Sequence, residues 1–272
     1  MESNHASSGR RVEGHEHEGS CWSISGKQVG PSGRRGRGSG LRRFAPAFIL
    51  CLCGVAPARG NDFAAAQGWL TQNQPINLDE QCSVLSGGAT KLACHLHTYP
   101  ADALLVGNTG IHVLASEATT IDELRMAGVY VPEHGDIFDL AAFSAKKKLK
   151  EKGYPCMLES WIPGTDIENN LRDFNSPQKD FWTTSLGKAA MKQGVGVDAL
   201  RNQTVPSLQA YLDFINSRSK YVTDVEMFIV GDGTVYLVDL AAGFGNRSSR
   251  VQTWKTQLQN AIQSINSLKT GK

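Results

Sequence analysis

The stretch TDVEMFIVGDGTVYLVDLAAG, residues 223–243, predicts a short β-hairpin with one aspartate just outside each strand. Two apolar, β-favouring runs, Met227–Val230 and Val235–Val238, flank the turn sequence GDG. Because the strands of a hairpin run antiparallel, Asp224 before the first strand and Asp239 after the second fall at the same end. The pair is a candidate for chemistry, although acidic residues also end strands in ordinary folds.

The composition fits one domain of ordinary size with an appendage. The chain has 272 residues, of which 40% are apolar and 20% charged. Residues 1–43 are rich in Gly, Ser, Arg and His and cannot build a core, so we predict a disordered extension. The alternative is that the start codon is assigned too early and that this extension is not expressed. A net charge of +2 says little about partners, and we expect no nucleic-acid partner.

Residues 44–60 are typical of a secretory signal peptide. A basic pair, Arg42-Arg43, precedes the apolar run FAPAFILCLCGVAPA, which is shorter than the about 20 residues of a membrane span. We therefore expect secretion, with a mature chain that starts near Arg59 and has no stable membrane association. Because polar residues precede this segment, a short membrane anchor remains the alternative.

Three cysteines lie in the expected mature chain, Cys82, Cys94 and Cys156. Cys82 and Cys94 are symmetrical about Gly88, so they could face each other across a hairpin and form a disulfide in an oxidising compartment. Two small apolar residues packed in a strand pair would look the same. The absence of a CxxC motif and of matching histidines gives no zinc pattern.

The mature chain predicts mostly strands first and mostly helices later, which is an α+β fold. Residues 61–80 are expected to be a linker or lead-in. Strands are predicted at Gln81–Leu85, Lys91–Thr98, Ala103–Val106, Ile111–Leu114 and Pro155–Trp161. Helices are predicted at Glu117–Gly128 behind a Ser116 cap, Ala141–Gly153, Asp166–Phe174, Asp180–Gln193, Ser207–Ser217 and Arg247–Leu268.

Four segments in this order resemble the motifs of protein kinases: VLSGGATKLACHL, EATTIDELRMAGVYVP, CMLESWIPG and the aspartate hairpin. The resemblance covers residues 81–272 and implies a two-lobed fold, with a β-rich N-lobe (residues 81–159) and a shortened helical C-lobe (residues 160–272). Only about thirty residues follow Asp239, which is most similar to minimal effector kinases of the HopBF type. That type implies a monomeric secreted virulence effector, delivered into host cells, that uses ATP and Mg²⁺ to phosphorylate a host protein such as a heat-shock chaperone.

The resemblance assigns the nucleotide site. Gly87 and Gly88 would let backbone N–H groups approach the phosphates, although adjacent glycines also make plain hairpin turns. The expected third-strand lysine is missing, and Lys91 would replace it, as in the "with no lysine" kinases. Glu117 would hold this lysine, with Glu123 as the fallback. As alternatives, Lys91 is a solvated strand residue and each glutamate a surface acid.

The resemblance assigns the catalytic and metal roles as well. Asp224 would orient or deprotonate the acceptor hydroxyl, and Asp239 would bind Mg²⁺. Ile229 occupies the place of the usual asparagine ligand, so Glu226 is the candidate second ligand unless it points to solvent. Glu159 and Trp161, in the segment that resembles the hinge, would contact the nucleotide. The residue before Asp224 is a threonine and not the usual arginine.

Two other classes of function stay open. A pseudokinase-like binding module would keep the fold without catalysis, as the missing lysine and asparagine allow. A secreted α+β protein that binds a carbohydrate or protein would use both aspartates only as strand ends. The sequence does not choose between Ser/Thr and Tyr acceptors.

Overall fold

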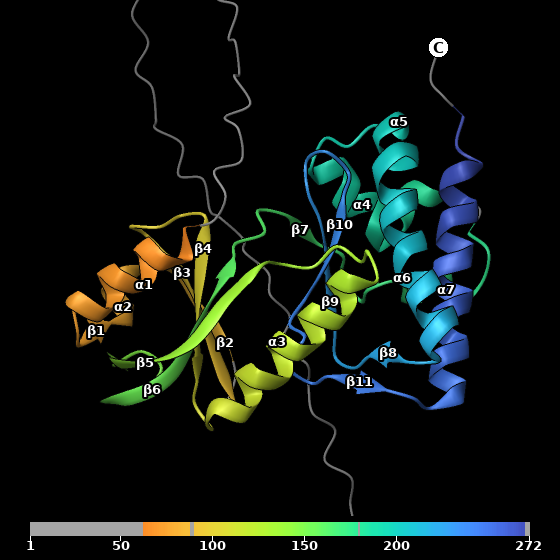
Figure 1. The fold of residues 1–272 in the computed structure, drawn as a ribbon. Coiled ribbons are helices and arrows are strands. Elements are labelled where there is room, and N and C mark those ends of the chain that lie inside the picture. Colours follow the sequence, from red (N-terminus) through yellow and green to blue (C-terminus); the bar gives the residue numbers. More distant parts are fainter. Residues whose placement is uncertain (1–61, 88–89, 179, 270–272) are drawn as a thin grey trace, which may run out of the picture. The chain divides into compact units, whose positions relative to one another are not determined.

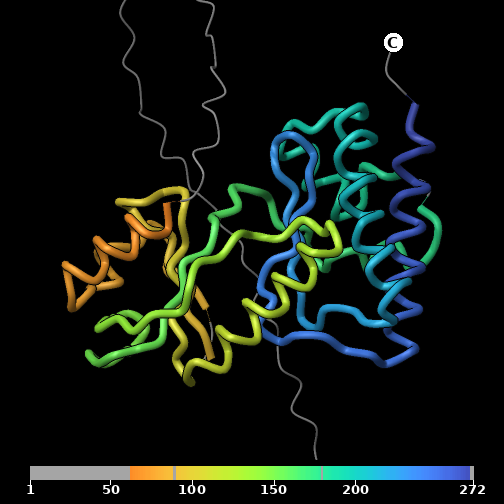
Figure 2. The backbone as a smooth tube through the Cα atoms, in the orientation of Figure 1, coloured from red at the N-terminus to blue at the C-terminus, as the bar shows by residue number. Residues whose placement is uncertain are grey.

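The computed structural model of this protein describes residues 62–87, 90–178 and 180–269, which belong to one compact unit (Figure 1). The predicted extension, the predicted signal peptide and Gly88 lie outside the described residues. The fold is α+β. Figure 2 shows the chain passing from a β-rich part, coloured orange to green, into a largely helical part, coloured cyan to blue.

A mixed, curled six-stranded sheet dominates the β-rich part, with the order β1-β5-β6-β4-β3-β2. Its strands are β1 (Ile76–Asn77), β2 (Cys82–Gly87), β3 (Lys91–Leu96), β4 (Asp102–Gly107), β5 (His134–Ser144) and β6 (Leu149–Ser160). Only β1 and β5 pair in parallel, and the other neighbours are antiparallel. The predicted strands around the glycine turn are confirmed.

The two faces of this sheet bury different partners. In β3 the side chains alternate, so Leu92, Cys94 and Leu96 join one buried cluster, which helix α1 (Phe63–Gln72) completes with Leu70. The opposite face packs against helix α3 (Ile111–Met126) through a smaller cluster of Leu105, Leu114 and Met157. Lys91 follows the alternation of β3 and belongs to this second face.

The lead-in segment is part of the fold. Asp62 caps α1 by accepting a hydrogen bond from the backbone N–H of Ala65, and α2 (Leu78–Gln81) follows β1. Ala66, Leu70, Ile76 and Leu78 are fully buried or nearly so. Residues 63–81 therefore close one face of the sheet, which a linker would not do.

The prediction of a strand at Ile111–Leu114 with a helix cap at Ser116 was wrong, because α3 already begins at Ile111. Gly110 precedes the helix with a φ of 124°, a conformation that glycine adopts without steric cost. Leu114 is fully buried against the sheet, so tertiary packing outweighs the strand preference of the short apolar run.

The prediction of a basic helix at Ala141–Gly153 was also wrong. This segment forms the ends of β5 and β6 and the turn between them, in which Lys148 has a φ of 54°. In β5 the buried residues Ala142 and Ser144 alternate with partly buried ones, as in a strand, whereas the lysines of the turn and of β6 are exposed. Pairing between the two strands determines the structure of this segment.

The aspartate hairpin is confirmed: β9 (Glu226–Ile229) pairs antiparallel with β10 (Val235–Val238). Strand β7 (Thr165–Asp166) adds to the other side of β9, within a segment predicted as a helix. The prediction of a helix at Asp166–Phe174 was wrong, because only a 3₁₀ turn, η1 (Arg172–Asn175), forms there. A further pair, β8 (Tyr221–Val222) with β11 (Phe244–Gly245), closes the hairpin's base.

The helical part surrounds a second and larger hydrophobic cluster. Its elements are η2 (Phe181–Thr183), α4 (Ser185–Lys192), α5 (Val197–Ala199), the π-helical η3 (Leu200–Thr204), α6 (Val205–Arg218) and α7 (Ser248–Asn266). The predicted last two helices are confirmed, and they meet through an edge-to-face contact of Tyr211 with Trp254 at 5.7 Å. In the described ranges, no helix has the length and apolar character needed to cross a membrane.

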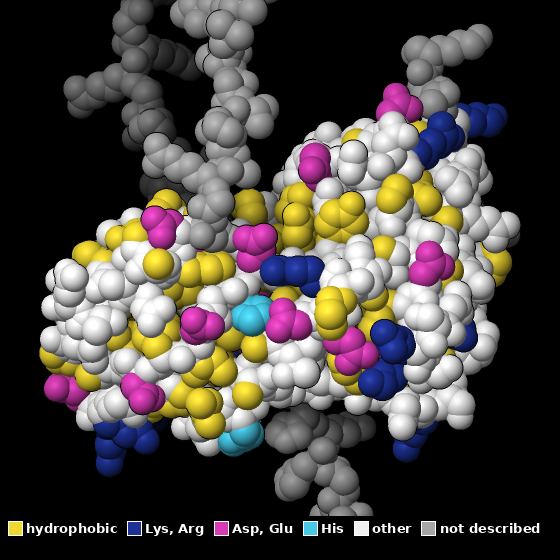
Figure 3. All heavy atoms as spheres, viewed as in Figure 1, with side chains coloured by type: hydrophobic (Ala, Val, Ile, Leu, Met, Phe, Trp, Pro, Cys, Tyr) yellow, Lys and Arg dark blue, Asp and Glu magenta, His cyan; other side chains and the backbone are white. Residues whose placement is uncertain are grey.

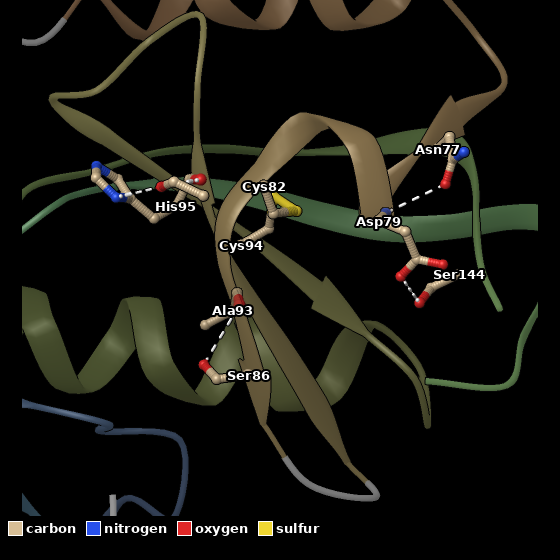
Figure 4. The surroundings of a disulfide bond; sticks show 9 residues. Asn77, Asp79, Cys82, Ser86, Ala93, Cys94, His95 and Ser144 are labelled. Atoms are coloured by element: carbon tan, nitrogen blue, oxygen red, sulfur yellow. Dashed lines mark hydrogen bonds between the residues drawn. A yellow bond between two sulfur atoms is a disulfide. The ribbon is translucent and has the colours of Figure 1, made fainter. Parts of the chain in front are cut away.

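A disulfide joins Cys82 to Cys94 across the β2–β3 pair, which resolves the open alternatives (Figure 4). It lies at the end of the hairpin remote from the glycine turn. The remaining described cysteine, Cys156, is a buried free thiol.

Candidate active site

Lys91 is the centre of an ion network that joins three elements. Its ammonium Nζ lies 2.6 Å from both carboxylate oxygens of Glu117 on α3 and 3.1 Å from Oδ1 of Asp239 after β10. The Glu117 side chain is fully buried, and the Lys91 side chain is 12% exposed. Two residues predicted from sequence as phosphate-contacting cation and partner are thus in contact.

The electrostatics keep Lys91 charged. Burial alone would lower the pKa of the ammonium, but the carboxylates of Glu117, Asp239 and Glu159 raise it above its usual value. An ammonium held in this way presents a permanent positive charge to any anion that enters the site.

Asp224 and Asp239 line one pocket, as expected of residues at the same end of a hairpin. The pocket is also lined by Asp166, Ile167, Asn169, Asn170, Val225 and Glu226. Its polar side chains are carboxylates and amides, which are the oxygen ligands that Mg²⁺ prefers.

Backbone strain is concentrated at this pocket. Four of the six non-glycine residues with left-handed φ in the described chain line it, namely Asn169, Asn170, Asp224 and Asp239. Such conformations cost energy and persist only where surrounding contacts enforce them, and they cluster at functional sites. Both aspartates are therefore held in fixed, uncommon positions by their neighbours.

Contacts on two sides fix the backbone at Asp224. On one side Asn170 Nδ2 donates a hydrogen bond to the Val225 carbonyl at 2.7 Å. On the other, the Thr223 hydroxyl donates to the carbonyls of Ala242 and Gly243, each at 2.9 Å. Thr223 thus ties the segment before Asp224 to the segment after Asp239.

Two glutamates in the site have raised pKa values. Burial, together with the charges of Asp239, Asp166 and Asp224, raises the pKa of Glu226 to about 7. Burial and the neighbouring Glu117 carboxylate raise the pKa of Glu159, whose Oε1 atom is buried without a hydrogen-bond partner. Glu159 is therefore close enough to Glu117 and Lys91 to respond to their charge.

Three other residues predicted for the nucleotide site, Gly87, Trp161 and Glu123, have structural contacts of their own. Gly87 has a φ of 112°, and a Cβ there would come 2.4 Å from the Lys91 carbonyl oxygen, so glycine is required by the hairpin itself. The Trp161 ring stacks on His95 with 4.1 Å between centroids, and Trp161 is not among the residues of the acidic pocket. Glu123, the alternative partner, pairs with Lys220.

Sequence reasoning missed Asp166, Asn169 and Asn170. Asp166 reaches the pocket because β7 pairs with β9, a contact between segments about sixty residues apart in the chain. The Asn169-Asn170 dipeptide was the available signal, since asparagine tolerates the left-handed conformation better than most residues.

The described residues bring no three His, Cys, Asp or Glu side chains together in an arrangement ready to hold a metal ion. Mg²⁺ usually binds one or two carboxylates and takes its remaining ligands from phosphates and water. The donor set around Asp239 therefore fits a Mg²⁺ that arrives with a phosphate group.

Comparisons with known proteins leave the chain without an assigned family. No protein-family model matches it, and no curated protein matches it.

Proposed function

We propose that this protein is a minimal, protein-kinase-like phosphotransferase that uses ATP and Mg²⁺ to phosphorylate a hydroxyl group of a protein. The α+β fold supports a two-lobed interpretation, because one hydrophobic cluster forms around the sheet and another among the helices. The first would be the β-rich N-lobe and the second the shortened C-lobe.

The contact of Lys91 with both Glu117 and Asp239 is the observation that carries the proposal. A kinase needs a cation on the nucleotide phosphates, a carboxylate that holds this cation, and a carboxylate on the metal. The three residues come from β3, α3 and the end of β10, and their convergence would be unusual for unrelated strand-end and surface charges.

Each residue then has a role in the transfer. Lys91 binds phosphate oxygens, Glu117 orients Lys91, and Asp224 orients the acceptor hydroxyl and accepts its proton. A new bond forms between the acceptor oxygen and the γ-phosphorus, while the bond from that phosphorus to the bridging oxygen of ADP breaks. Positioning and charge neutralisation supply most of the catalysis in such reactions.

The charge balance of the site supports a need for divalent cations. Three carboxylates lie around Lys91, those of Glu117, Asp239 and Glu159. The pocket that Asp239 lines adds three more, those of Asp166, Asp224 and Glu226. Several phosphate charges would meet repulsion there, and bound Mg²⁺ supplies the positive charge that offsets it. Asp239 would hold the metal, with Glu226 as the candidate second ligand.

A binding module without catalysis is the second candidate, and one observation favours it. Ile229, at the position of the usual asparagine ligand, is fully buried in the helical cluster and can offer nothing to a metal. A protein with one metal ligand fewer could bind nucleotide without transferring phosphate.

The decisive experiment incubates the full chain with γ-labelled ATP, Mg²⁺ and a eukaryotic lysate, beside Asp239→Asn and Asp224→Asn. Asparagine tolerates left-handed φ, so both variants should fold. We expect labelled protein with the wild type only, and Asp224→Asn should lower kcat far more than ATP affinity. Wild-type activity in Asp239→Asn would refute the metal role.

A thermal-shift measurement and the labelling experiment together separate the two candidates. ATP with Mg²⁺ should raise the melting temperature of a kinase and of a nucleotide-binding module alike, whereas only the kinase labels protein. If ATP with Mg²⁺ does not raise the melting temperature and no protein is labelled, the chain is neither a kinase nor a nucleotide-binding module. The proposal then fails in favour of the carbohydrate- or protein-binding alternative.

We also propose that the protein is secreted. The Cys82–Cys94 disulfide supports this, because such bonds persist in oxidising compartments. Expression of the full chain in a eukaryotic secretory host should release protein whose first residue lies near Arg59. Retention of the intact N-terminus inside the cell would contradict it.

A further inference from the structure

The tip of the hairpin formed by β5 and β6 carries a dense positive charge. Five exposed lysines occupy seven consecutive positions there: Lys146, Lys147, Lys148, Lys150 and Lys152. Glu151 is the single acid among them. Figure 3 shows dark blue side chains gathered at the lower left, at the end of this hairpin.

The charge is local to the hairpin. Residues 62–272 contain 19 Lys and Arg but 22 Asp and Glu, so the rest of this part of the chain is acidic. The candidate active site itself contains six carboxylates and one lysine. Positive and negative charge are thus separated onto different regions, which directs oppositely charged partners to different places.

The lysine-bearing turn is held in one conformation by Asp79 of α2. Its Oδ1 accepts a hydrogen bond from the Ser144 hydroxyl at 2.6 Å (Figure 4). Its Oδ2 accepts from the backbone N–H groups of Ala145 and Lys146. The Ser144 hydroxyl in turn accepts from the backbone N–H of Lys147 at 3.0 Å. A preformed turn loses little backbone entropy when a partner binds.

Protection of a sheet edge explains part of this charge only. Residues 149–155 of β6 pair with β5 on one side, and no described strand pairs with their other side, where lysines discourage edge-to-edge association. Lys150 and Lys152 fit this role. Lys146, Lys147 and Lys148 lie in the turn, where no strand edge needs protection.

The chemistry of the tip selects the partner. The four exposed large apolar side chains of the described chain are Ile111, Met126, Tyr130 and Met191, and none lies on this hairpin. The tip therefore has nothing to insert into a bilayer or to stack on bases. It also lacks arginine, whose planar group suits phosphate recognition, and lysine ammonium groups pair readily with single carboxylates.

We propose that the tip of the β5–β6 hairpin binds an acidic segment of a protein partner. Lys152 and Glu159 of the candidate site lie seven positions apart on β6, a distance of about 23 Å along an extended strand. The acidic segment and a ligand in the pocket can therefore bind at the same time. This inference is independent of phosphoryl transfer and would hold for a protein without catalytic activity.

Fluorescence anisotropy with a labelled poly-glutamate peptide tests the proposal on the full chain. The variant Lys147→Glu/Lys150→Glu should bind the peptide about tenfold more weakly than the wild type. The matched control, Lys188→Glu/Arg218→Glu, changes the net charge equally at exposed positions outside the hairpin and should bind within about twofold of the wild type. Equal losses in both variants would overturn the assignment to the tip.

Two further measurements complete the test. The variant Asp79→Ala keeps all five lysines and removes a carboxylate that contacts the turn, so the tip becomes more positive while the turn is freed. If the held turn matters, this variant should bind the peptide more weakly than the wild type despite the added positive charge. Heparin, duplex DNA and anionic vesicles serve as competing probes at about 150 mM NaCl. Tighter binding of any of these than of poly-glutamate would replace the acidic protein segment with that class of partner and overturn the proposal.

Discussion

The carboxylate of Glu117 accepts a hydrogen bond from the backbone N–H of Leu240, with 3.2 Å between Oε1 and N. The same carboxylate binds Lys91 through both oxygens. One buried side chain on α3 therefore fixes the candidate phosphate-binding cation and also the backbone next to Asp239. Because one carboxylate makes both contacts, a movement of α3 away from the sheet would break them together.

Replacing Lys91 by methionine should abolish phosphoryl transfer and destabilise the fold. The buried Glu117 carboxylate would lose its ion partner, which typically costs about 3–5 kcal/mol of unfolding free energy. Chemical denaturation and ATP-dependent labelling check the two effects separately. The double variant Lys91→Met/Glu117→Leu should regain much of the stability and none of the activity. A single variant as stable as the wild type would show that the pair contributes little.

Asn170 should matter to turnover more than to nucleotide affinity. Its amide holds the Val225 carbonyl, next to the strained backbone of Asp224, and glycine at this position tolerates the left-handed φ but lacks the amide. We expect Asn170→Gly to lower kcat about tenfold or more with a small change in KM for ATP.

The control for that variant is Asn260→Ala, which removes the same kind of bond, from Asn260 Nδ2 to the Phe174 carbonyl, outside the pocket. Both variants should lose some stability, and only Asn170→Gly should lose turnover. Equal kcat values would mean that Asn170 is purely structural.

The residues predicted from sequence were those whose signals are local. The β9–β10 hairpin and its aspartates were found because alternating runs and a glycine turn specify a hairpin without help from distant residues. The start of α3 and the lysine hairpin were missed because packing of Leu114 and pairing of β5 with β6 outweigh local preference.

The missed part of the site depends on contacts remote in sequence. Asp166 reaches the pocket through the pairing of β7 with β9, and Asn170 through its bond to Val225. No periodicity in a single segment encodes such a contact. The Lys91–Glu117 pair was predicted from the resemblance to protein kinases, which implies such a pair, and Lys91 is the single Lys or Arg between Cys82 and Glu117. The roles of both residues remain predictions.

Loss of the Cys82–Cys94 disulfide should weaken the sheet. The bond closes a short loop, and the variant Cys82→Ala/Cys94→Ala should lose about 2–4 kcal/mol of unfolding free energy. Urea denaturation measures the loss, and a thiol reductant should destabilise the wild type but leave the variant unchanged. Alkylation of Cys82 and Cys94 in the unfolded, unreduced protein would show that the bond is absent in solution.

The titration of Glu226 should make the fold less stable as the pH rises towards neutrality. Its pKa is about 7 in the folded protein against an ordinary value of 4.5, so between these values the folded state binds more protons than the unfolded state. Unfolding free energy then falls as the pH rises through this window, and the loss is complete above pH 7.

Glu226→Gln removes this contribution, so without added metal it should be more stable than the wild type at about pH 8 and show a smaller advantage at about pH 5. Urea denaturation at both pH values measures the difference, with Glu151→Gln on the exposed hairpin as the control that should follow the wild type. If Glu226→Gln gives no greater advantage at the higher pH, the carboxyl is already ionised in the folded protein without cost, and its burial among Asp166, Asp224 and Asp239 does not hold in solution.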